Sequence, residues 1–375
     1  MPLAIDVSRA NRGQRTGVEW FVFFVTDGLK KIVPPETEVV LYSETPLAGD
    51  LSKLPPRWRS RVLRWPPKKF WTVCRLSWEM LWHKPEALLI PAHVPPFFAP
   101  PRTIMVIHDI GHLRFPAAYS WFERWYADWT IKRAKKNAWQ IIAISEFTKK
   151  ELMEVYGFYA EKIAVVPLAA DQKFNRPKIL LEKIAAVKKR YGLDGAPYFL
   201  YVGRLEKKKN TAFLIRAFDE FKKMGGALRL VLVGKPGFGY EETVVAIDAS
   251  PNQKDIIELG YVQADDLAAL YAAAAAFLFP SLYEGFGIPV LEAFGSGTPV
   301  IASTSGAIPE VTGNAAILLP PDDLLAWVGA MQKILDPSLA TALREKGRER
   351  AAAFSWEKTA RGILAETYVG RIHNL

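Results

Sequence analysis

Two glutamates and the short glycine-containing segment between them could bind hydroxyl and phosphate groups together. Glu284 is followed directly by Gly285, Phe286 and Gly287, and Glu292 comes eight positions after Glu284. An ionised carboxylate only accepts hydrogen bonds, so each glutamate suits a neighbouring hydroxyl. The glycines let the backbone approach a ligand closely, and a helix that starts after them would direct its N–H groups and positive dipole end at one spot. The pattern predicts a phosphate site flanked by two hydroxyl-binding carboxylates.

Strand, loop and helix signals surround these residues in the order that such a site needs. The apolar run 277–279 predicts a buried strand that ends at Pro280. A helix is expected over 289–294, because proline suits the first helical turn and glycine follows the last. A second buried strand is expected over 299–302. The glutamates and glycines are therefore expected between the carboxyl end of a strand and the start of a helix.

The same stretch resembles the signature of retaining GT-B glycosyltransferases of family 4. The resemblance rests on the spacing Glu, seven residues, Glu, and on the segments SLYEGFGIPVLEAF and GTPVIAS. It implies that Glu284 and the backbone of Gly285 to Ile288 hold the donor sugar, and that Glu292 holds the ribose of the nucleotide. From the residues alone, the alternative is a helix with one solvated glutamate and one N-terminal glutamate that favours the dipole.

A group of cations follows another expected strand, 198–202. Gly203, Arg204 and Lys209 occur in the segment GRLEKKKN, where Arg offers a planar fork for phosphate oxygens and Lys a mobile point charge. Together they could neutralise a diphosphate leaving group, and the resemblance places the diphosphate-binding Arg and Lys of the family here. Positive charges at a helix N-terminus oppose its dipole, which favours a bound anion over the alternative of a solvated basic cluster. The predicted donor-binding set also includes Gly234 and Val262, which follow the next two expected strands.

Two histidines follow buried strands in the first half of the chain. His93 comes after the expected strand 87–90, and His108 and Asp109 come after 103–107. Ligands bind beyond the carboxyl ends of strands in open α/β sheets, so these side chains are placed to reach one. The segment IHDIGHLRFP resembles the family segment whose His contacts the donor sugar, which gives His108 that role. Asp109 and His93 are predicted on the acceptor side, and a structural role for His93 stays open.

A glycine loop also follows the first expected strand, 3–7. Gly17 precedes a helix expected over 18–32. The resemblance gives this loop a place near the acceptor and the donor phosphates, and a plain turn glycine is the alternative. Gly13 and Gly17 do not complete a dinucleotide fingerprint, so NAD is not predicted.

Length and composition allow two domains. The chain has 375 residues, of which half are apolar. The single Cys74 excludes an internal disulfide, and the start MPLAIDVSRA lacks the basic and apolar regions of a signal peptide. No apolar stretch reaches the ~20 residues that a membrane-spanning helix needs. We expect a cytoplasmic protein that could sit peripherally on the inner face of the membrane.

The formal net charge of +10 is concentrated in the first half of the chain. Residues 57–75 contain seven Lys or Arg, no acid, and the rings of Trp58, Trp65, Phe70 and Trp71. This mixture favours an anionic membrane surface, where rings sit at headgroup depth and cations meet lipid. Single-stranded nucleic acid is an alternative that is not predicted as a partner. The other alternative is a solvated basic face whose rings pack inward.

Strands and helices alternate along both halves, which specifies parallel sheets with helices on both faces. We predict an α/β fold with two Rossmann-like domains, and the resemblance implies the GT-B arrangement, in which they face each other across a central cleft. The acceptor-binding domain is expected over 1–173 and the nucleotide-sugar domain over 174–356. A last helix within 357–375 is expected to pack back on the first domain.

The resemblance implies a retaining hexosyltransferase that moves a sugar from a nucleotide-diphosphate donor to a glycan or lipid-linked acceptor in cell-surface polysaccharide synthesis. The GFGIPVLEA and HD contexts are most similar to bacterial mannosyltransferases, so GDP-mannose is the first donor predicted and a UDP-hexose the second. No DxD pair and no cluster with ligand spacing occurs, so neither a metal nor a cofactor is predicted. A GT-B sugar-nucleotide epimerase and a basic nucleic-acid-binding protein are the rival functions. A two-carboxylate hydrolase is disfavoured, because Glu284 and Glu292 share one loop and helix.

Overall fold

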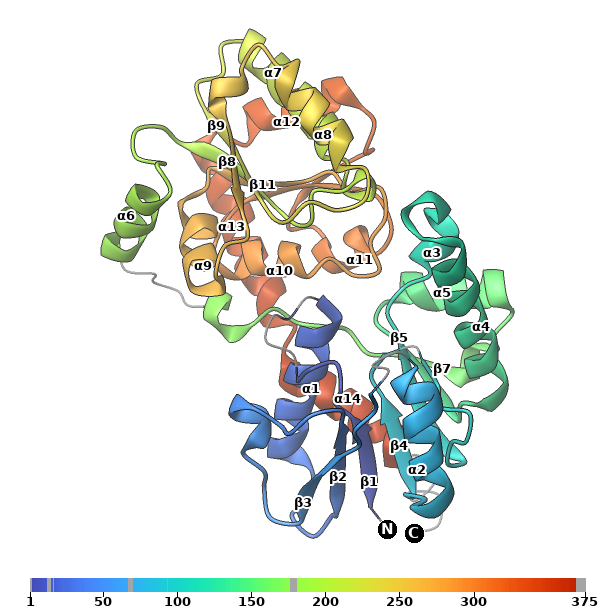
Figure 1. Cartoon of the computed structure of the whole chain (residues 1–375). Helices are drawn as coiled ribbons and strands as arrows, with labels where there is room; N and C mark the ends of the chain where they lie inside the picture. Colours follow the sequence, from blue (N-terminus) through green and yellow to red (C-terminus); the bar gives the residue numbers. More distant parts are fainter. Residues whose placement is uncertain are drawn as a thin grey trace. The chain divides into compact units, whose positions relative to one another are not determined.

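The computed structural model describes residues 2–11, 15, 17–66, 70–92, 94–175 and 181–368. The chain forms two compact units: unit 1 is Met1–Leu168 with Ser355–Leu375, and unit 2 is Ala169–Phe354 (Figure 1). This division comes five residues before the boundary expected from the sequence. The difference arises because Phe174 is buried in unit 2, with its ring centroid 5.8 Å from that of Tyr271.

Unit 1 is built on a seven-stranded parallel sheet in the order β3-β2-β1-β4-β5-β6-β7. The strands are β1 Leu3–Asp6, β2 Val39–Ser43, β3 Trp58–Val62, β4 Ala87–Ile90, β5 Arg102–Ile107, β6 Gln140–Ala143 and β7 Ile163–Val165. Nearly every residue of the central strands is buried, because helices cover both faces of the sheet.

The edge strand β3 starts at Trp58, which pairs with Val39 of β2. Arg57 has a φ of 64°, so the chain turns there and enters the sheet at the next residue. The pairing of β3 with β2 ends at Val62. The side chains of Leu63 and Trp65 then pack on the core of unit 1.

Two groups of helices cover the two faces of this sheet (Figure 1). One face is covered by α2 Ser77–Trp82, α4 Trp121–Asn137 and α5 Glu146–Tyr156, whose buried apolar side chains form one core with the strands. The other is covered by α1 Gly17–Ile32 and the last helix, α14 Trp356–Tyr368. These two helices approach so closely that a Cβ at Gly28 would lie 2.8 Å from the Cβ of Ala360. The last helix therefore packs on the first unit, as the sequence resemblance implied.

The rings of the basic stretch 57–75 mostly face inward. Trp58 and Trp71 are buried, Trp65 packs against the core, and the indole Nε1 of Trp71 donates to the Leu63 carbonyl at 2.7 Å. Only Phe70 is exposed among the four rings. The prediction that this stretch presents its aromatic rings to a membrane is therefore wrong for three of its four rings. The cations Lys68 and Lys69 lie outside the described residues.

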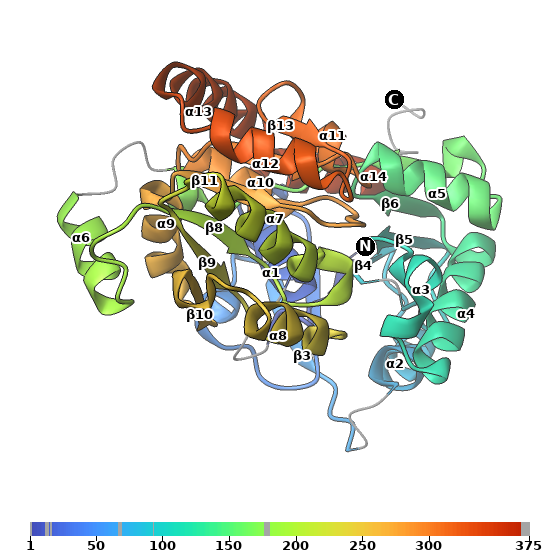
Figure 2. The ribbon, with the colours of Figure 1, turned by 90° about the horizontal axis from the view of Figure 1, so that it is seen from above.

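Unit 2 is built on a six-stranded parallel sheet in the order β10-β9-β8-β11-β12-β13. The strands are β8 Tyr198–Val202, β9 Arg229–Val233, β10 Ile256–Gly260, β11 Ala276–Phe279, β12 Val300–Ser303 and β13 Ile317–Leu319. The helices are α6 Leu181–Arg190, α7 Thr211–Lys223, α8 Tyr240–Asp248, α9 Ala264–Ala273, α10 Ile288–Gly295, α11 Ile308–Thr312, α12 Leu324–Lys333 and α13 Pro337–Ala352. Figure 2 shows these helices on both sides of the strands.

Each sheet has one point at which the order of its strands reverses. In unit 1 this switch point lies between β1 and β4, and in unit 2 it lies between β8 and β11. The connections on either side of a switch point leave in opposite directions, so a crevice opens there at the carboxyl ends of the strands. Each unit is therefore expected to bind its ligand at its own switch point. Among the helices of the described residues, none has both the length and the apolar composition to cross a bilayer.

Candidate functional site

The switch point of unit 2 brings together the cations after β8 and the glutamate after β11. Lys209 ends a short helical turn, Lys207–Lys209, and its Nζ lies 2.5 Å from Oε1 of Glu284. Both side chains are largely buried, with 14% and 12% of their surfaces exposed. The Lys209 ammonium also lies 5.5 Å from the ring centroid of Phe279, the last residue of β11. The structure therefore joins two of the predicted site residues in one ion pair.

Backbone contacts hold the two loops of this pair together. The N–H of Leu282 donates to the Lys208 carbonyl at 2.8 Å, which links the loop after β11 to the turn before α7. The Glu284 carbonyl accepts from the N–H of Ala307 at 3.0 Å. Gly306, at a φ of 61°, lies so close that a Cβ there would be 2.4 Å from the Glu284 carbonyl oxygen. This glycine was not predicted, although a glycine four positions after the expected strand 299–302, preceded by the polar residues Ser303 to Ser305, could have indicated a close backbone approach.

The glycines at the ends of β8 and β9 also touch. A Cβ at Gly234 would lie 1.8 Å from the carbonyl oxygen of Gly203, so position 234 admits no side chain in this backbone arrangement. The N–H of Gly203 donates to Val233, and that of Gly234 donates to Gly260 at the end of β10. Val262 follows as a buried side chain. The predicted residues after β8, β9 and β10 therefore form a row along the carboxyl edge of one sheet.

Acidic side chains accompany the basic cluster before α7. Glu206 is buried, with Oε1 3.6 Å from the Lys208 Nζ and Oε2 3.9 Å from the Arg204 Nε. Lys207 forms an ion pair with Glu242 of α8. The lysines of the cluster are thus balanced by carboxylates of the protein itself, a feature that sequence analysis missed. Arg204 remains 66% exposed, which leaves its guanidinium accessible to an anion.

The start of α10 has the features expected of an anion site. Gly287 caps the helix at a φ of 108°, which favours glycine, and Pro289 lies in the first turn. Phe286 is buried against Phe354, with ring centroids 5.9 Å apart, and this packing anchors the loop. Ile288, a predicted donor-binding residue, is the first residue of the helix. The helix N-terminus follows Glu284 directly, so an anion bound here would lie beside the ion pair.

Glu292 lies in the second turn of α10 in a different environment from Glu284. Its Oε2 accepts from the hydroxyl of Tyr271 in α9 at 3.1 Å. Burial raises the pKa of the Glu292 carboxyl to about 7, against lowering contributions from the Tyr271 hydrogen bond and the Lys173 charge. Glu292 therefore changes charge near neutral pH. Tyr271 was not singled out from the sequence, because the helical pattern of α9 gives no sign of which side chain faces α10.

In unit 1, His108 follows β5 and packs against α1. Its Nε2 lies 3.0 Å from the Pro91 carbonyl oxygen and its ring contacts Phe21 edge to face at 4.8 Å. A carbonyl only accepts, so Nε2 carries the proton and Nδ1 is left as an acceptor. Burial lowers the pKa of His108, which keeps the imidazole neutral. The neighbouring Asp109 accepts from the N–H of Gly111 at 2.9 Å.

The other predicted residues of unit 1 are less informative. Gly17 starts α1 with nothing within 4 Å of an added Cβ, so no close contact requires glycine there. His93 lies outside the described residues. His112, in the segment IHDIGHLRFP, is buried with Nε2 3.0 Å from the Tyr156 hydroxyl, which is a structural role.

A pocket of about 420 Å³ lies at the switch point of unit 1 and was not predicted. Its floor is Asp6, the last residue of β1, whose carboxylate accepts from the Ser8 N–H at 3.0 Å and the Thr72 hydroxyl at 3.2 Å. Burial raises the pKa of Asp6. The walls include the Arg9 guanidinium and the rings of Phe70, Trp71, Phe122 and Tyr126. The position of Asp6 at the end of a buried apolar run could have indicated this pocket. The expected strand extended through Val7, so Asp6 was taken as an interior strand residue.

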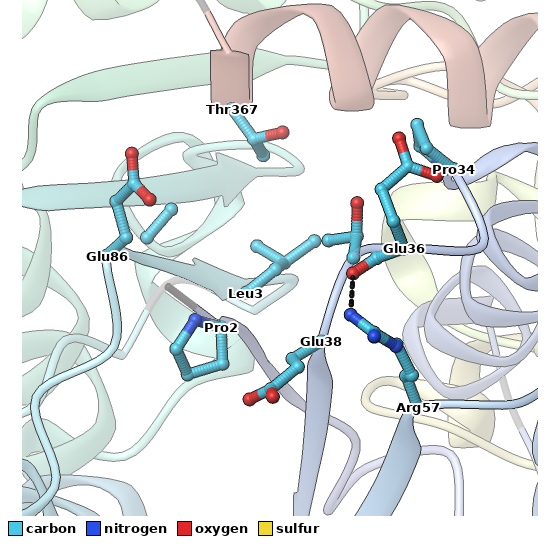
Figure 3. A pocket seen from close by; sticks show the side chains of 10 residues that line it. Pro2, Leu3, Pro34, Glu36, Glu38, Arg57, Glu86 and Thr367 are labelled. Atoms are coloured by element: carbon cyan, nitrogen blue, oxygen red, sulfur yellow. Dashed lines mark hydrogen bonds between the residues drawn. The ribbon is translucent and has the colours of Figure 1, made fainter.

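A second pocket of unit 1, also about 420 Å³, lies at the opposite edge of the sheet (Figure 3). It is lined by Leu3, Glu38 and Ala87, which stand at the amino ends of strands, and by Thr367 of α14. The Arg57 guanidinium at its rim donates to the Glu36 carbonyl at 2.9 Å. Because it lies away from the switch point, we assign it no function. Within the described residues, no three His, Cys, Asp or Glu side chains gather so as to hold a metal ion.

Both halves of the chain match known families. Residues 183–350 match the family "Glycosyl transferases group 1", and residues 16–174 match "Glycosyltransferase Family 4". The chain is 31% identical over 271 residues to the O-antigen chain mannosyltransferase B of Escherichia coli, which covers 71% of this chain and 70% of that protein. It is 30% identical over 253 residues to the MMP alpha-(1->4)-mannosyltransferase of Mycolicibacterium hassiacum, which covers 64% of this chain and 57% of that protein.

Solved structures resemble the chain over its full length. The sucrose-phosphate synthase of Thermosynechococcus elongatus superposes with a TM-score of 0.76 at 22% identity, and 100% of each chain is covered. HepE of Anabaena, in complex with UDP-glucose, gives a TM-score of 0.76 at 17% identity with the same coverage. At these identities the likeness concerns the fold.

The raised pKa of Glu292 predicts a pH-dependent stability difference. Because the pKa of this carboxyl rises from 4.5 to about 7, folding takes up a proton between these values, and the folded protein loses stability as the pH rises through this window. The full loss is ~3 kcal/mol. Glu292→Gln cannot ionise, so its unfolding free energy should equal that of the wild type below about pH 4.5 and exceed it above about pH 7.

Urea unfolding of both proteins at about pH 5 and about pH 8 checks this expectation. Glu349→Gln, at an exposed position of α13, is the matched control, and as a surface substitution it should leave the unfolding free energy nearly unchanged. A constant difference between Glu292→Gln and the wild type at both pH values would contradict the raised pKa.

Proposed function

The chain belongs to glycosyltransferase family 4 and is a hexosyltransferase with the GT-B fold, and on that premise we propose that it transfers mannose from GDP-mannose to a glycan or lipid-linked acceptor in cell-surface polysaccharide synthesis. The choice of mannose is supported by relatives that are named mannosyltransferases, two of them for O-antigen chains. A UDP-hexose is the second candidate, because HepE, which has the same fold, is described with UDP and UDP-glucose.

The observation that supports this proposal most is the cluster of Arg204, Lys209 and Glu284 at the switch point of unit 2. Arg204 and Lys209 suit the diphosphate of the donor, since one is an exposed planar fork and the other an ammonium held in place by packing. Glu284 suits the hydroxyls of the transferred sugar, and the α10 N-terminus suits the phosphate beside it. Glu292, ionised, suits the two ribose hydroxyls.

In the proposed reaction the acceptor hydroxyl attacks C1 of the sugar on the side that the diphosphate leaves. The bond between C1 and the phosphate oxygen breaks, the bond between C1 and the acceptor oxygen forms, and the hydroxyl proton passes to the leaving diphosphate. The charge on that diphosphate grows as the bond breaks, so fixed cations stabilise the transition state more than the bound substrate. His108 would accept a hydrogen bond from a substrate hydroxyl through Nδ1, the nitrogen that Pro91 leaves unused. No metal enters this reaction.

For the acceptor sugar we propose the unpredicted pocket of unit 1. Aromatic rings offer flat apolar faces, and the carboxylate of Asp6 and the guanidinium of Arg9 offer an acceptor and donors for hydroxyl groups. A pocket of about 420 Å³ falls in the usual size range of small-ligand sites. Asp109 would lie near this acceptor side. We place the reaction in the cytoplasm at the inner face of a membrane, with no part for nucleic acid.

Removal of the exposed cation should slow transfer without unfolding the protein. We expect Arg204→Ala to lower the turnover of GDP-mannose about a hundredfold, because a preorganised donor to the developing charge is lost. Lys207→Ala is the matched control: it removes a cation of the same loop whose ion-pair partner is Glu242, and its turnover should change little. Lys209→Ala should lose turnover and also some stability, since it leaves the largely buried Glu284 without its partner. Equal turnover of Arg204→Ala and Lys207→Ala, measured on folded protein, would refute the role of Arg204.

The front-face reaction predicts that the product keeps the anomeric configuration of the donor. NMR of the first product, taken before anomers equilibrate, gives the one-bond coupling constant between C1 and H1, which distinguishes an α- from a β-mannosyl linkage. An α-linked donor should give an α-linked product. An inverted linkage would require a general base of the protein that removes the proton of the acceptor hydroxyl. It would overturn the roles proposed for Glu284 and the diphosphate.

A further inference from the structure

Unit 1 exposes large aromatic side chains to an unusual extent. Every exposed tryptophan of the described residues lies in this unit, and Trp82 and Trp121 are 71% and 72% exposed. Seven exposed rings lie on α2, on the loop after β4 and on the first turns of α4, and together they are called the aromatic face: Trp78, Trp82, Phe97, Phe98, Trp121, Phe122 and Trp125. A patch of this kind on a folded protein marks a surface that binds something.

The aromatic face is held together by ordered contacts. The Phe97 N–H donates to the Ser77 hydroxyl at 2.6 Å, which fixes the loop against the start of α2. Trp129 of α4 packs against this loop and against the preceding turn of its own helix. Its ring centroid lies 5.7 Å from that of Phe97 and 6.3 Å from that of Trp125. Helices α2 and α4 cover the same face of the sheet (Figure 1), and the Phe97 loop contacts both of them.

The outward position of these rings follows from how α4 is anchored. Only Thr130, Ile131 and Ala134 of α4 are buried, so the second half of the helix holds it to the core. The first turn is fixed by a capping box, in which Ser120 and Glu123 exchange hydrogen bonds. The rings of Trp121 and Trp125 are therefore presented on a rigid helix and have no room in the core.

The chain segment that carries the aromatic face is mainly basic. Residues 70–139 contain nine Lys or Arg and five Asp or Glu. Each of the five acids has a partner within unit 1: Glu79 pairs with Arg61 and Arg75, Glu86 with Arg102 and Asp128 with Lys132, Glu123 caps α4, and Asp109 accepts from Gly111. The surplus of cations suits an anionic surface.

A cavity of about 560 Å³ adjoins the aromatic face at the Phe97 loop. Its lining includes Pro95, Pro96 and Pro100, and its cations are Arg133 and Lys136. The Arg133 guanidinium is held in place, since it donates to the Phe97 carbonyl at 2.6 Å and lies 4.9 Å from the Phe97 ring centroid. Two cations that line one cavity fit the headgroup of an anionic lipid.

We propose that the aromatic face docks unit 1 on an anionic lipid bilayer. Tryptophan rings prefer the depth of the headgroups, and Lys and Arg beside them meet anionic lipid. Interfaces with proteins are depleted in Lys, whereas Lys136 lines the cavity beside this face. The inference deepens the proposed function, because a lipid-linked acceptor lies at such a surface. It replaces the stretch 57–75 as the membrane contact that the sequence had predicted.

Co-sedimentation of the full chain with vesicles tests the proposal, without any nucleotide sugar present. Vesicles of phosphatidylcholine and phosphatidylglycerol in equal parts should bind the protein, and vesicles of phosphatidylcholine alone should bind it much less. Trp82→Ala and Trp121→Ala should each weaken partitioning about tenfold, the effect of leaving one large apolar side chain unburied. Tyr159→Ala is the matched control, an aromatic residue of unit 1 that is 70% exposed but outside the aromatic face.

The electrostatic contribution to vesicle binding is tested separately. Lys136→Ala should weaken binding to the anionic vesicles about fivefold, as expected for one cation near an anionic surface. Lys150→Ala, on the exposed side of α5, should have no effect. Added salt should weaken the binding of the wild type.

Three results would overturn the proposal: equal binding to both kinds of vesicle, equal losses in Trp121→Ala and Tyr159→Ala, or self-association through the aromatic face with no vesicle binding. Transfer to a water-soluble acceptor should be unchanged in Trp121→Ala, because this ring does not line the proposed acceptor pocket. Failure of membrane binding and failure of the proposed transferase function are therefore observed independently.

Discussion

The ion pair between Lys209 and Glu284 is the interaction on which the site of unit 2 depends. It joins the turn after β8 to the loop after β11 at the place where the strand order of the sheet reverses. Both groups are largely buried, so each needs the other's charge while no ligand is bound. A diphosphate could replace Glu284 as the partner of Lys209, and Glu284 would then be released to accept hydrogen bonds from sugar hydroxyls. In this account the pair keeps both groups oriented in the absence of the donor.

The backbone around the pair leaves little freedom. Gly306 allows one loop to approach Glu284, and Gly234 allows the end of β9 to approach Gly203. A side chain at either position would displace backbone that orients the ion pair or its neighbours, so these glycines help to position the site. Unit 1 also has its pocket at the point where the strand order reverses. The buried acid of that pocket, Asp6, is the last residue of the first strand.

Sequence reasoning worked best where a pattern was local. The strands 87–90 and 198–202 were predicted to the residue, because continuous apolar runs between helices specify buried parallel strands. It failed where the position of a side chain depends on contacts with residues that are distant in the sequence. Nothing local shows that Tyr271 meets Glu292, that Glu206 and Glu242 balance the lysines, or that Trp58 and Trp71 turn inward while Trp82 and Trp121 face outward. The basic stretch 57–75 looked exposed from its composition, and tertiary packing placed the exposed rings elsewhere.

Calorimetric titration of GDP and of GDP-mannose into the wild type and Glu284→Gln tests the central claim most directly. If a diphosphate replaces Glu284 at Lys209, the variant should bind GDP at least as tightly as the wild type does, because no ion pair has to be broken. The same variant should lose the extra affinity that the mannosyl group gives the wild type. Titration of UDP and UDP-glucose in parallel shows which nucleotide the site accepts. A variant that loses affinity for GDP and for GDP-mannose by the same factor would contradict the account, since Glu284 would then serve the nucleotide rather than the sugar.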